Sequence, residues 1–458
     1  MTTRLRDYGT ARILCSHVSK SRSHVSRSQI EKTMIETIYQ HYLKAHKVCT
    51  DSRKIEKDAV FFALKGENFD ANDFALQVAE QGVASLVVAD RKDLPKHERI
   101  LIVDNTLKTL QDLAAYHRSQ SKAIVLSITG TNGKTTTKEL VSAVLAQKYN
   151  IIHTQGNLNN HIGVPLTLLS IQPDTEIAVV EMGANHPGEI DFLCKIADPD
   201  YGLITNIGKA HLEGFGSFEG VIKTKTELYR HIKNHGKAVF VNQGNPLLWE
   251  QSEGQERISY GRHCGAFCPV APGFCNPYLS VVWRKRHIQT HLVGSYNFEN
   301  VAAAIGVGQY FGVEDDKIVE ALEAYTPTNS RSQVIETQKN RIIMDAYNAN
   351  PTSMRAALIN FHTICGENHL LILGDMRELG TASEEEHRSI LALMKELGFK
   401  EAMLVGENFC AYNENAGWQT FEKVGDLCHY LESHPISGKT ILVKGSNSIQ
   451  LGKVLPLL

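Results

Sequence analysis

The sequence lacks the features that mark membrane proteins, nucleic-acid-binding proteins and disulfide-rich proteins. It has no run of about 18 apolar residues, so no membrane-spanning helix is predicted. The 48 basic and 50 acidic residues give a net charge of −2, which predicts no broad basic surface for nucleic acid. The nine cysteines are scattered, and the closest group (Cys264, Cys268 and Cys275) lacks a fourth ligand at zinc-like spacing. These absences favour reduced thiols and a cytoplasmic location.

What is present is the composition of an ordinary globular protein. Hydrophobic residues make up 42% and charged residues 21% of the 458 positions, and this length predicts two to four domains. Residues 1–33 differ because they are rich in Ser, Arg, Lys and His and contain no apolar segment of a secretory signal. We expect them to be a loose extension, or Met34 to be the natural start. An amphipathic helix is predicted to begin at Met34.

The most informative stretch is SITGTNGKTTTKEL, which spans Ser127–Leu140. The apolar residues Ile124–Leu126 before it predict a buried strand, and the residues after Gly133 have the spacing of a helix. A strand, a glycine turn and a helix N-terminus form a site for anions, because unpaired backbone N–H groups and the helix dipole point at the ligand. The residues predicted to contact the nucleotide are Gly130, Thr131, Asn132, Gly133, Lys134, Thr135 and Thr136.

The spacing differs from that of the common phosphate loop. GxxxxGK[ST] requires glycine at position 128, which is Ile128 here, so the motif is the shorter GxxGKTTT. In this interpretation Lys134 supplies positive charge for the β- and γ-phosphates, and Thr135 supplies a hydroxyl for Mg²⁺. The alternative is a structural turn that merely contains Gly and Lys. The flanking strand and helix favour nucleotide binding.

Three later residues are candidates for a metal site in the same domain. Glu181 ends the apolar segment EIAVVEM, and a carboxylate at the end of an α/β strand lies on the ligand side of the sheet. It is either structural or a Mg²⁺ ligand, and the preceding phosphate loop favours Mg²⁺. His211 follows the next strand and is either a loop histidine or a second metal ligand. Lys225, on a helix predicted over Val221–His231, is either a solvated charge or part of the site.

Several polar groups are candidates for substrate contacts. In the first domain, Ser52 and Arg53 beside a strand are either a helix cap and a solvated charge or part of a pocket for a phosphorylated or sugar-nucleotide ligand. The amide-rich loop after Gln155 suits sugar hydroxyls, peptide groups and phosphates, because amides both donate and accept hydrogen bonds. Asn297 and Asn300 lie one turn apart on a predicted helix, where they either cap it or bind an adenine edge.

The pattern of strands and helices predicts an α/β protein of three domains. Residues 34–122 form a small α/β substrate domain, residues 123–326 a central phosphate-loop domain with a parallel sheet, and residues 327–458 a C-terminal Rossmann-like α/β domain. Alternation of strands and helices implies parallel sheets with ligands at the carboxyl ends of the strands. Most polar motifs fall at those ends.

Taken together, these motifs resemble those of the Mur ligases of peptidoglycan synthesis. The resemblance rests on GTNGKTTT, VVEMGANHPGEI, NIGKAHLEGFGS, DAYNANPTSM and LGDMRELG, and it covers essentially all of residues 34–458. It implies an ATP- and Mg²⁺-dependent amide ligase, active as a monomer, that makes an acyl phosphate of the substrate carboxylate. DAYNANPTSM, LGDMRELG and the GNLNNHIGVPLTLL loop resemble the members that add D-Ala-D-Ala to UDP-N-acetylmuramoyl-tripeptide.

The resemblance also implies roles for individual residues. It implies that Thr135 and Glu181 serve one Mg²⁺ and His211 a second, and that Lys225 occupies a position carbamylated in several Mur ligases. For ATP it implies Asn297 and Asn300 at adenine, Asp345 at ribose and Arg331 at the γ-phosphate. The positions around the UDP-sugar-peptide are Ser52, Arg53, Asn157, Asn159, Asn160 and His161. Those on the dipeptide side are Tyr347, Asn348, Asn350 and Lys444.

Other interpretations stay open from the sequence. The nearest is another ligase of the same superfamily, either one that adds glutamate or a diamino acid or one like folylpolyglutamate synthetase. A nucleotide-regulated binding protein without ligase activity is a second. A phosphate-loop kinase or GTPase is a third, and the short loop and the absence of an NKxD stretch argue against a GTPase.

Overall fold

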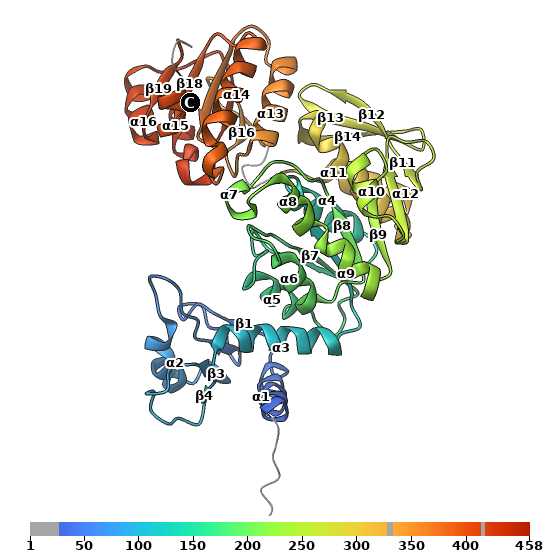
Figure 1. The fold of residues 1–458 in the computed structure, drawn as a ribbon, viewed down its shortest axis with the longest axis vertical. Helices are drawn as coiled ribbons and strands as arrows, with labels where there is room; N and C mark the ends of the chain where they lie inside the picture. Colours follow the sequence, from blue (N-terminus) through green and yellow to red (C-terminus); the bar gives the residue numbers. More distant parts are fainter. Residues whose placement is uncertain (1–26, 328–332, 414–416) are drawn as a thin grey trace, which may run out of the picture.

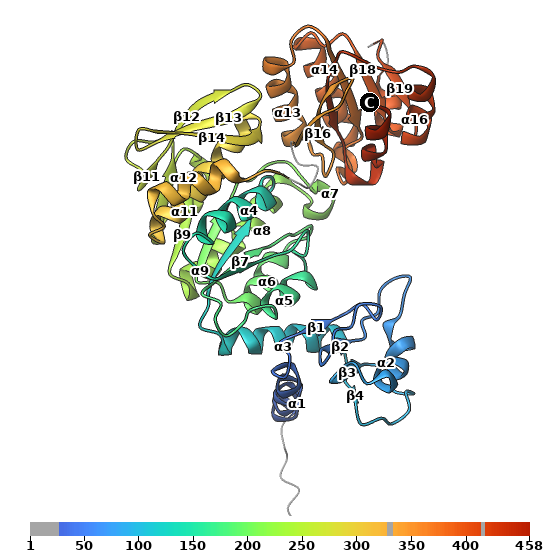
Figure 2. The same cartoon turned by 180° about the vertical axis from the view of Figure 1, so that it is seen from behind.

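The computed structural model describes residues 27–327, 333–413 and 417–458. It shows three α/β units that follow one another along the long axis of the molecule, in chain order (Figures 1 and 2). Each unit is built around its own mainly parallel sheet, as the alternation of strands and helices predicts. Among the described residues, no helix is both long and apolar enough to cross a membrane.

The first unit is a four-stranded parallel sheet in the order β1-β2-β3-β4. Its elements are α1 (Arg27–Tyr42), β1 (Val48–Cys49), β2 (Val60–Phe62), η1 (Ala71–Phe74), α2 (Ala75–Gln81), β3 (Leu86–Ala89), β4 (Ile100–Ile102) and α3 (Thr106–Gln120). The predicted helix start at Met34 is wrong, because α1 begins at Arg27. The rest of the proposed extension, residues 1–26, lies outside the described residues.

The central unit contains a seven-stranded, all-parallel sheet in the order β11-β10-β9-β8-β5-β7-β6. Its strands are β5 (Ile124–Thr129), β6 (Ile151–His153), β7 (Ile177–Glu181), β8 (Tyr201–Ile204), β9 (Ala238–Asn242), β10 (Arg257–Gly261) and β11 (Cys268–Pro269). Its helices are α4 (Lys134–Leu145), α5 (Gly163–Leu168), α6 (Glu189–Ala197), α7 (Leu212–Phe215), α8 (Phe218–Lys225), α9 (Glu227–His235), α10 (Pro246–Gln251), α11 (Phe298–Tyr310) and α12 (Asp315–Ala324). Apolar clusters cover both faces of β5, so this strand is buried.

The single helix predicted over Val221–His231 is wrong, because the structure has two helices that meet at Thr226. The Thr226 hydroxyl donates to the carbonyls of Ile222 (2.8 Å) and Lys223 (3.2 Å). Such side-chain bonds to the preceding turn compete with the helix ladder and favour a bend. The break leaves Lys225 at the end of α8, pointing into the protein.

A small antiparallel sheet covers one side of the central unit. It consists of β12 (Ala271–Cys275), β13 (Tyr278–Trp283) and β14 (Arg286–Val293), in that order. The part of the chain from β10 to β14 is therefore rich in strands. Strands β10 and β11 of the same stretch extend the central parallel sheet, and β14 leads through η2 (Ser295–Asn297) into α11.

The third unit has a six-stranded sheet in the order β15-β16-β20-β17-β18-β19, in which only β15 runs antiparallel. Its strands are β15 (Gln333–Glu336), β16 (Arg341–Asp345), β17 (His369–Gly374), β18 (Ala402–Val405), β19 (Gln419–Phe421) and β20 (Thr440–Lys444). Its helices are α13 (Pro351–Ile364), η3 (Gly380–Ala382), α14 (Ser383–Glu396), α15 (Glu407–Tyr412), α16 (Val424–Ser433), η4 (Asn447–Ile449) and η5 (Leu451–Leu457).

The central and third units meet where the carboxyl ends of their strands face each other. Lys209, which follows β8, pairs with Glu386 of α14 over 2.8 Å. Asn132 of the phosphate loop exchanges hydrogen bonds with Asn350 at the start of α13. Loops that follow parallel strands carry ligand sites in such sheets. The boundary between the two units is therefore the first place to look for a site.

Candidate active site

The phosphate loop connects β5 to α4, as predicted, and two glycines are required for its shape. Gly133 has φ +78° at the N-terminus of α4, and a Cβ there would lie 2.5 Å from Asn300 Oδ1. Gly130 has φ +144°, and its Cβ would lie 2.0 Å from Thr205 Oγ1. Both positions combine a backbone conformation that favours glycine with no room for a side chain. The loop is therefore a backbone surface open to a ligand.

Lys134 is folded back over this loop. Its ammonium donates to the carbonyl oxygens of Gly130 (2.9 Å) and Thr131 (3.0 Å). These neutral acceptors hold the charge above the N-terminus of α4, where backbone N–H groups also attract anions. An incoming phosphate would find the ammonium and the helix N-terminus on the same side, which is the arrangement that the sequence predicted.

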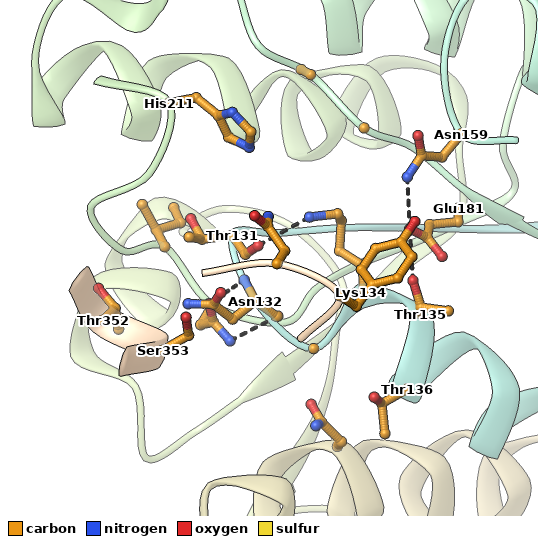
Figure 3. Close-up of a pocket in the computed structure, with 18 of the residues that line it drawn as sticks. Thr131, Asn132, Lys134, Thr135, Thr136, Asn159, Glu181, His211, Thr352 and Ser353 are labelled. Carbon is orange, nitrogen blue, oxygen red and sulfur yellow. Dashed lines mark hydrogen bonds between the residues drawn. The ribbon is translucent and has the colours of Figure 1, made fainter. Parts of the chain in front are cut away.

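Glu181 lies at the end of β7 with one satisfied and one unsatisfied oxygen. Its Oε1 accepts from Thr135 Oγ1 (3.2 Å) and from Asn159 Nδ2 (2.8 Å), and Figure 3 shows both side chains converging on it. Its Oε2 is buried without a hydrogen-bond partner among the described residues. A buried carboxylate oxygen without a partner is unfavourable unless a cation or donor satisfies it. A hydroxyl beside such a carboxylate fits Mg²⁺, which is bound through few protein ligands plus phosphates.

Lys225 does not line the site surface. The side chain is fully buried, with Nζ 3.3 Å from the Ala184 carbonyl and 5.4 Å from the centre of the Phe215 ring. Burial, reinforced by the charge of Lys134, lowers the pKa of Lys225 well below that of an exposed lysine. The interpretation as a solvated charge is therefore wrong. A lysine that is readily neutral is a nucleophilic amine.

His211 faces the third unit rather than Glu181. Its Nδ1 contacts the carboxylate of Glu378, which lies in the loop after β17, and Figure 3 shows the imidazole above the phosphate loop. This contact holds the pKa of the Glu378 carboxyl below its usual value. Both residues have positive φ, +50° and +63°, which non-glycine residues seldom adopt. Two strained loops thus meet across the boundary.

Asn297 and Asn300 form a connected pair at the start of α11. Asn297 donates to the Val293 carbonyl (2.8 Å), and Asn300 donates to Asn297 Oδ1 (2.8 Å). Thr137 of α4 in turn donates to Asn300 Oδ1 (3.0 Å). The pair is thus buried and fixed against the phosphate-loop helix, and the Asn297 side chain makes no capping hydrogen bond to α11.

In the third unit, the predicted residues form two hydrogen-bonded groups. Lys444 at the end of β20 is buried and pairs with Asp345 at the end of β16 (2.7 Å), and it also donates to the Asn348 carbonyl (3.2 Å). Asn350 caps α13 by accepting from the Ser353 N–H (2.9 Å) and donates to Asn132 Oδ1 (2.7 Å). The second group fixes the third-unit loop against the phosphate loop.

A cavity of about 1000 Å³ joins these elements across the two units. The predicted residues that line it are Thr131, Asn132, Gly133, Lys134, Thr135, Thr136, Asn157, Asn159, Asn160, His161, Glu181, His211, Asn297, Asn300, Asp345, Tyr347, Asn348 and Lys444. Gly130, Lys225 and Asn350 do not line it, although Asn350 is hydrogen-bonded to the lining residue Asn132. The structure therefore gathers residues from seven separate parts of the sequence into one space.

Three more predicted residues are not among the residues that line the cavity. Ser52 and Arg53 belong to the first unit and do not line this cavity. The Arg53 side chain is 84% exposed and pairs with Asp51 over 2.8 Å, and the guanidinium lowers the pKa of the Asp51 carboxyl to about 2. Arg331 lies outside the described residues.

Several further polar residues line the cavity without a role predicted from the sequence. They are Asn185, His186, Glu189, Arg262, Thr352 and Glu378. Four of them lie in VVEMGANHPGEI or LGDMRELG, and Thr352 lies in DAYNANPTSM. The signal that could have found them is their place in polar loops directly after apolar strands. Arg262 carries no such signal, because it comes from the β-rich stretch.

Comparison with known protein families agrees with this geometry. The family model described as "Mur ligase middle domain" matches residues 128–308. The model described as "Mur ligase, glutamate ligase domain" matches residues 330–447, and "Mur ligase family, catalytic domain" matches residues 44–118. Matches to these three models thus follow one another along the chain.

Curated relatives match over nearly the full length. The UDP-N-acetylmuramoyl-tripeptide–D-alanyl-D-alanine ligase of Bacillus subtilis is 35% identical over 425 residues, which cover 90% of this chain and 92% of the relative. The Escherichia coli enzyme of the same name is 34% identical over 434 residues, covering 89% of this chain and 92% of the relative.

Solved structures match the fold as well. MurF from Acinetobacter baumannii has a TM-score of 0.79 at 31% identity, covering 90% of this chain and 92% of that chain. MurF ligase from Thermotoga maritima in complex with ADP also has a TM-score of 0.79, at 26% identity, covering 90% of this chain and 96% of that chain. The phosphate loop, the facing third-unit loops and these matches lead to one conclusion: the chain belongs to the Mur ligase family.

Proposed function

We propose that this protein is an ATP-dependent amide ligase that joins D-Ala-D-Ala to the peptide carboxyl end of UDP-N-acetylmuramoyl-tripeptide. The observation that carries the proposal is the cavity of about 1000 Å³, in which a phosphate-binding loop faces polar loops of a second α/β unit. The names of the relatives from Bacillus subtilis and Escherichia coli support the choice of substrates. The ADP bound to the Thermotoga maritima enzyme supports the nucleotide.

The chemistry requires an activated carboxylate. A carboxylate does not react with an amine until one of its oxygens becomes a good leaving group. Transfer of the γ-phosphoryl group of ATP to the substrate carboxylate makes an acyl phosphate and ADP. The dipeptide amine then attacks the acyl carbon, and phosphate leaves with the electron pair of the C–O bond. Lys134 and the N-terminus of α4 offset the repulsion between the two anions at the first step.

The metal in this proposal is Mg²⁺, held by Thr135 and Glu181, with His211 serving a second ion. The unsatisfied, buried Oε2 of Glu181 supports the first assignment. Bound Mg²⁺ would neutralise charge on the phosphates. Lys225 would contribute as a carbamate, because its depressed pKa leaves the neutral amine that reacts with CO₂. In the structure His211 contacts Glu378, so serving a metal requires this contact to open.

The remaining residues divide between the substrates. For ATP we assign Asn297 and Asn300 to adenine, Asp345 to ribose and Arg331 to the γ-phosphate. For the UDP-sugar-peptide we assign Ser52, Arg53, Asn157, Asn159, Asn160 and His161. For D-Ala-D-Ala we assign Tyr347, Asn348, Asn350 and Lys444. Since ATP and the UDP-linked precursor are cytoplasmic metabolites, we expect the enzyme to act in the cytoplasm. From the family resemblance we also expect it to act as a monomer.

Phosphate release tests the proposal directly. It is measured with ATP, Mg²⁺ and UDP-N-acetylmuramoyl-tripeptide, with and without D-Ala-D-Ala. Strict dependence on the dipeptide is the expected result. Release that responds instead to D-Glu, Lys or diaminopimelate would move the protein to another amide ligase of this family. No release with any amine would leave a nucleotide-binding protein and overturn the proposal.

A further inference from the structure

We propose that Glu378 binds the ammonium group of the incoming D-Ala-D-Ala. This inference rests on the proposed function, because it names the residue that recognises the amine substrate at the same site. Glu378 lies in the loop after β17, lines the cavity and faces His211 of the central unit. Its side chain is 55% exposed, compared with 24% for His211, so the carboxylate is accessible to a ligand that enters the cavity.

The loop that carries Glu378 is fixed from several sides. The Arg377 N–H donates to Ser446 Oγ (3.0 Å), which ties the loop to the end of β20 beside Lys444. The Met376 N–H donates to Nε2 of the buried His387 (3.1 Å). Asp375 is fully buried and accepts from the backbone N–H groups of α15. These contacts hold Glu378 at φ +63° and direct it toward the cavity.

Four other carboxylates line the cavity, and each already has a donor; that of Glu299 is the side chain of Asn242. Glu181 accepts from Thr135 and Asn159, and Asp345 pairs with Lys444 at 2.7 Å. Glu189 accepts from the N–H groups of Asn185 (2.7 Å) and His186 (3.0 Å). Glu378 instead faces an imidazole, a group that is charged only when protonated. Glu378 is thus open to a cation that enters with the dipeptide, whereas the unsatisfied Oε2 of Glu181 is assigned to Mg²⁺.

Its position also suits the attacking amine. Glu378 comes from the third unit, and the phosphate-binding part of α4, which lines the same cavity, belongs to the central unit. D-Ala-D-Ala carries an ammonium group in water at neutral pH. That group enters a space whose phosphate side is lined by Lys134, which repels it. The Glu378 carboxylate attracts the ammonium and holds its nitrogen in the cavity. The ammonium loses a proton to solvent, and the neutral amine then attacks the acyl carbon from this held position.

The alternative is that Glu378 only holds the two units together through His211. A second ion pair crosses the same boundary, between Lys209 and Glu386 (2.8 Å). It serves as a control that distinguishes dipeptide binding from a contact between units. Glu378→Gln removes the charge and keeps the size, and Glu386→Gln does the same at the matched pair. Both variants are compared with the wild type in steady-state phosphate release, after thermal unfolding shows that they are folded.

We expect Glu378→Gln to raise KM for D-Ala-D-Ala at least 10-fold, while KM for ATP and for UDP-N-acetylmuramoyl-tripeptide change less than 3-fold. Glu378→Asp should recover part of the loss, and Glu386→Gln should leave KM for the dipeptide unchanged. Equal effects of Glu378→Gln and Glu386→Gln would overturn the proposal in favour of a contact between units. So would a Glu378→Gln enzyme whose KM for the dipeptide equals that of the wild type.

A competitor without the ammonium group gives an independent readout. D-Lactoyl-D-alanine has a hydroxyl in its place and is used as an inhibitor against D-Ala-D-Ala. The wild type should prefer the dipeptide over this competitor strongly, and Glu378→Gln should reduce the preference at least 5-fold. An unchanged preference would overturn the role of Glu378 while leaving the ligase assignment intact. Wild-type phosphate release that does not depend on the dipeptide would overturn both.

Discussion

Asn350 Nδ2 donates to Asn132 Oδ1 over 2.7 Å, so the amide that caps α13 in the third unit also holds the phosphate loop of the central unit. The two side chains meet at the boundary where the cavity lies. In the proposed reaction, ATP is held by the central unit and the amine substrate by the third unit. This pair therefore fixes the phosphate loop and the start of α13 relative to each other.

The first prediction concerns this pair. Asn350→Ser should retain the helix cap, because a serine hydroxyl also accepts from the Ser353 N–H, but it should lose the contact with Asn132. We expect kcat/KM to fall about 5-fold, corresponding to about 1 kcal/mol for one hydrogen bond, with little change in stability. A double-mutant cycle of Asn132→Ala and Asn350→Ser measures the coupling. Strictly additive losses in kcat/KM would contradict the prediction.

The second prediction concerns Lys225. Because its pKa is lowered by burial, the neutral amine should form a carbamate with dissolved CO₂. Protein equilibrated with ¹³C-bicarbonate should show a carbamate carbon by NMR in the wild type and none in Lys225→Met. Activity of this variant should fall at least 100-fold. Lys223→Met is the matched control, since Lys223 is exposed on the same helix. A carbamate signal that persists in Lys225→Met would reject the assignment.

The third prediction concerns Gly133. Gly133→Ala places a methyl group 2.5 Å from Asn300 Oδ1 at φ +78°. Gly438→Ala has a similar φ of +71° but meets no atom within 4 Å, so it reports the backbone strain alone. We expect both to lose about 1 kcal/mol of unfolding free energy, with a further loss for Gly133→Ala. Only Gly133→Ala should raise KM for ATP, by at least 10-fold. A similar rise in Gly438→Ala would contradict the explanation by contact.

The fourth prediction concerns Glu181. In protein without metal, its buried and unsatisfied Oε2 should be destabilising, so Glu181→Gln should have the same or a higher melting temperature. Adding Mg²⁺ with a non-hydrolysable ATP analogue should stabilise the wild type more than Glu181→Gln. Glu176→Gln is the control, because Glu176 is exposed and directly precedes β7, the strand that ends at Glu181. Mg²⁺ with the ATP analogue should stabilise this variant as much as the wild type. Equal stabilisation of all three proteins would argue against Glu181 as a metal ligand.

The fifth prediction concerns the pH dependence of stability. His387 is buried, accepts from the Met376 N–H and has a pKa lowered mainly by burial. Because the unfolded chain takes up this proton at higher pH than the folded protein, the free energy of unfolding should fall as pH decreases below about 6.5.

The slope due to His387 should not exceed about 1.4 kcal/mol per pH unit. Urea unfolding between pH 7.5 and 5.5 should give a smaller slope for His387→Gln than for the wild type. His429→Gln, whose side chain is 89% exposed, should keep the wild-type slope. If all three proteins share one slope, the neutral ring of His387 is not the cause of the pH dependence of stability.

Much of this protein can be predicted from its sequence, because short segments determine their own structure. Gly130, Gly133 and Lys134 are close in sequence, so the strand, turn and helix that they form follow from local spacing alone. The α/β class follows for the same reason, since apolar strands and amphipathic helices alternate along the chain. Element ends were less predictable: the helix expected from Met34 begins at Arg27, and Thr226 divides the helix expected over Val221–His231.

Only the tertiary structure decides which of the polar residues meet. The sequence places Lys225 on a helix, but the packing of that helix determines its burial and therefore its pKa. The sequence contains Glu378 within a recognisable motif, but its contact with His211 depends on how two separate units face each other. Hydrogen bonds and ion pairs between distant segments depend on the arrangement of whole sheets, which local spacing does not encode. The sequence by itself determined the phosphate loop and the fold class, and the folded arrangement decided the composition of the cavity around them.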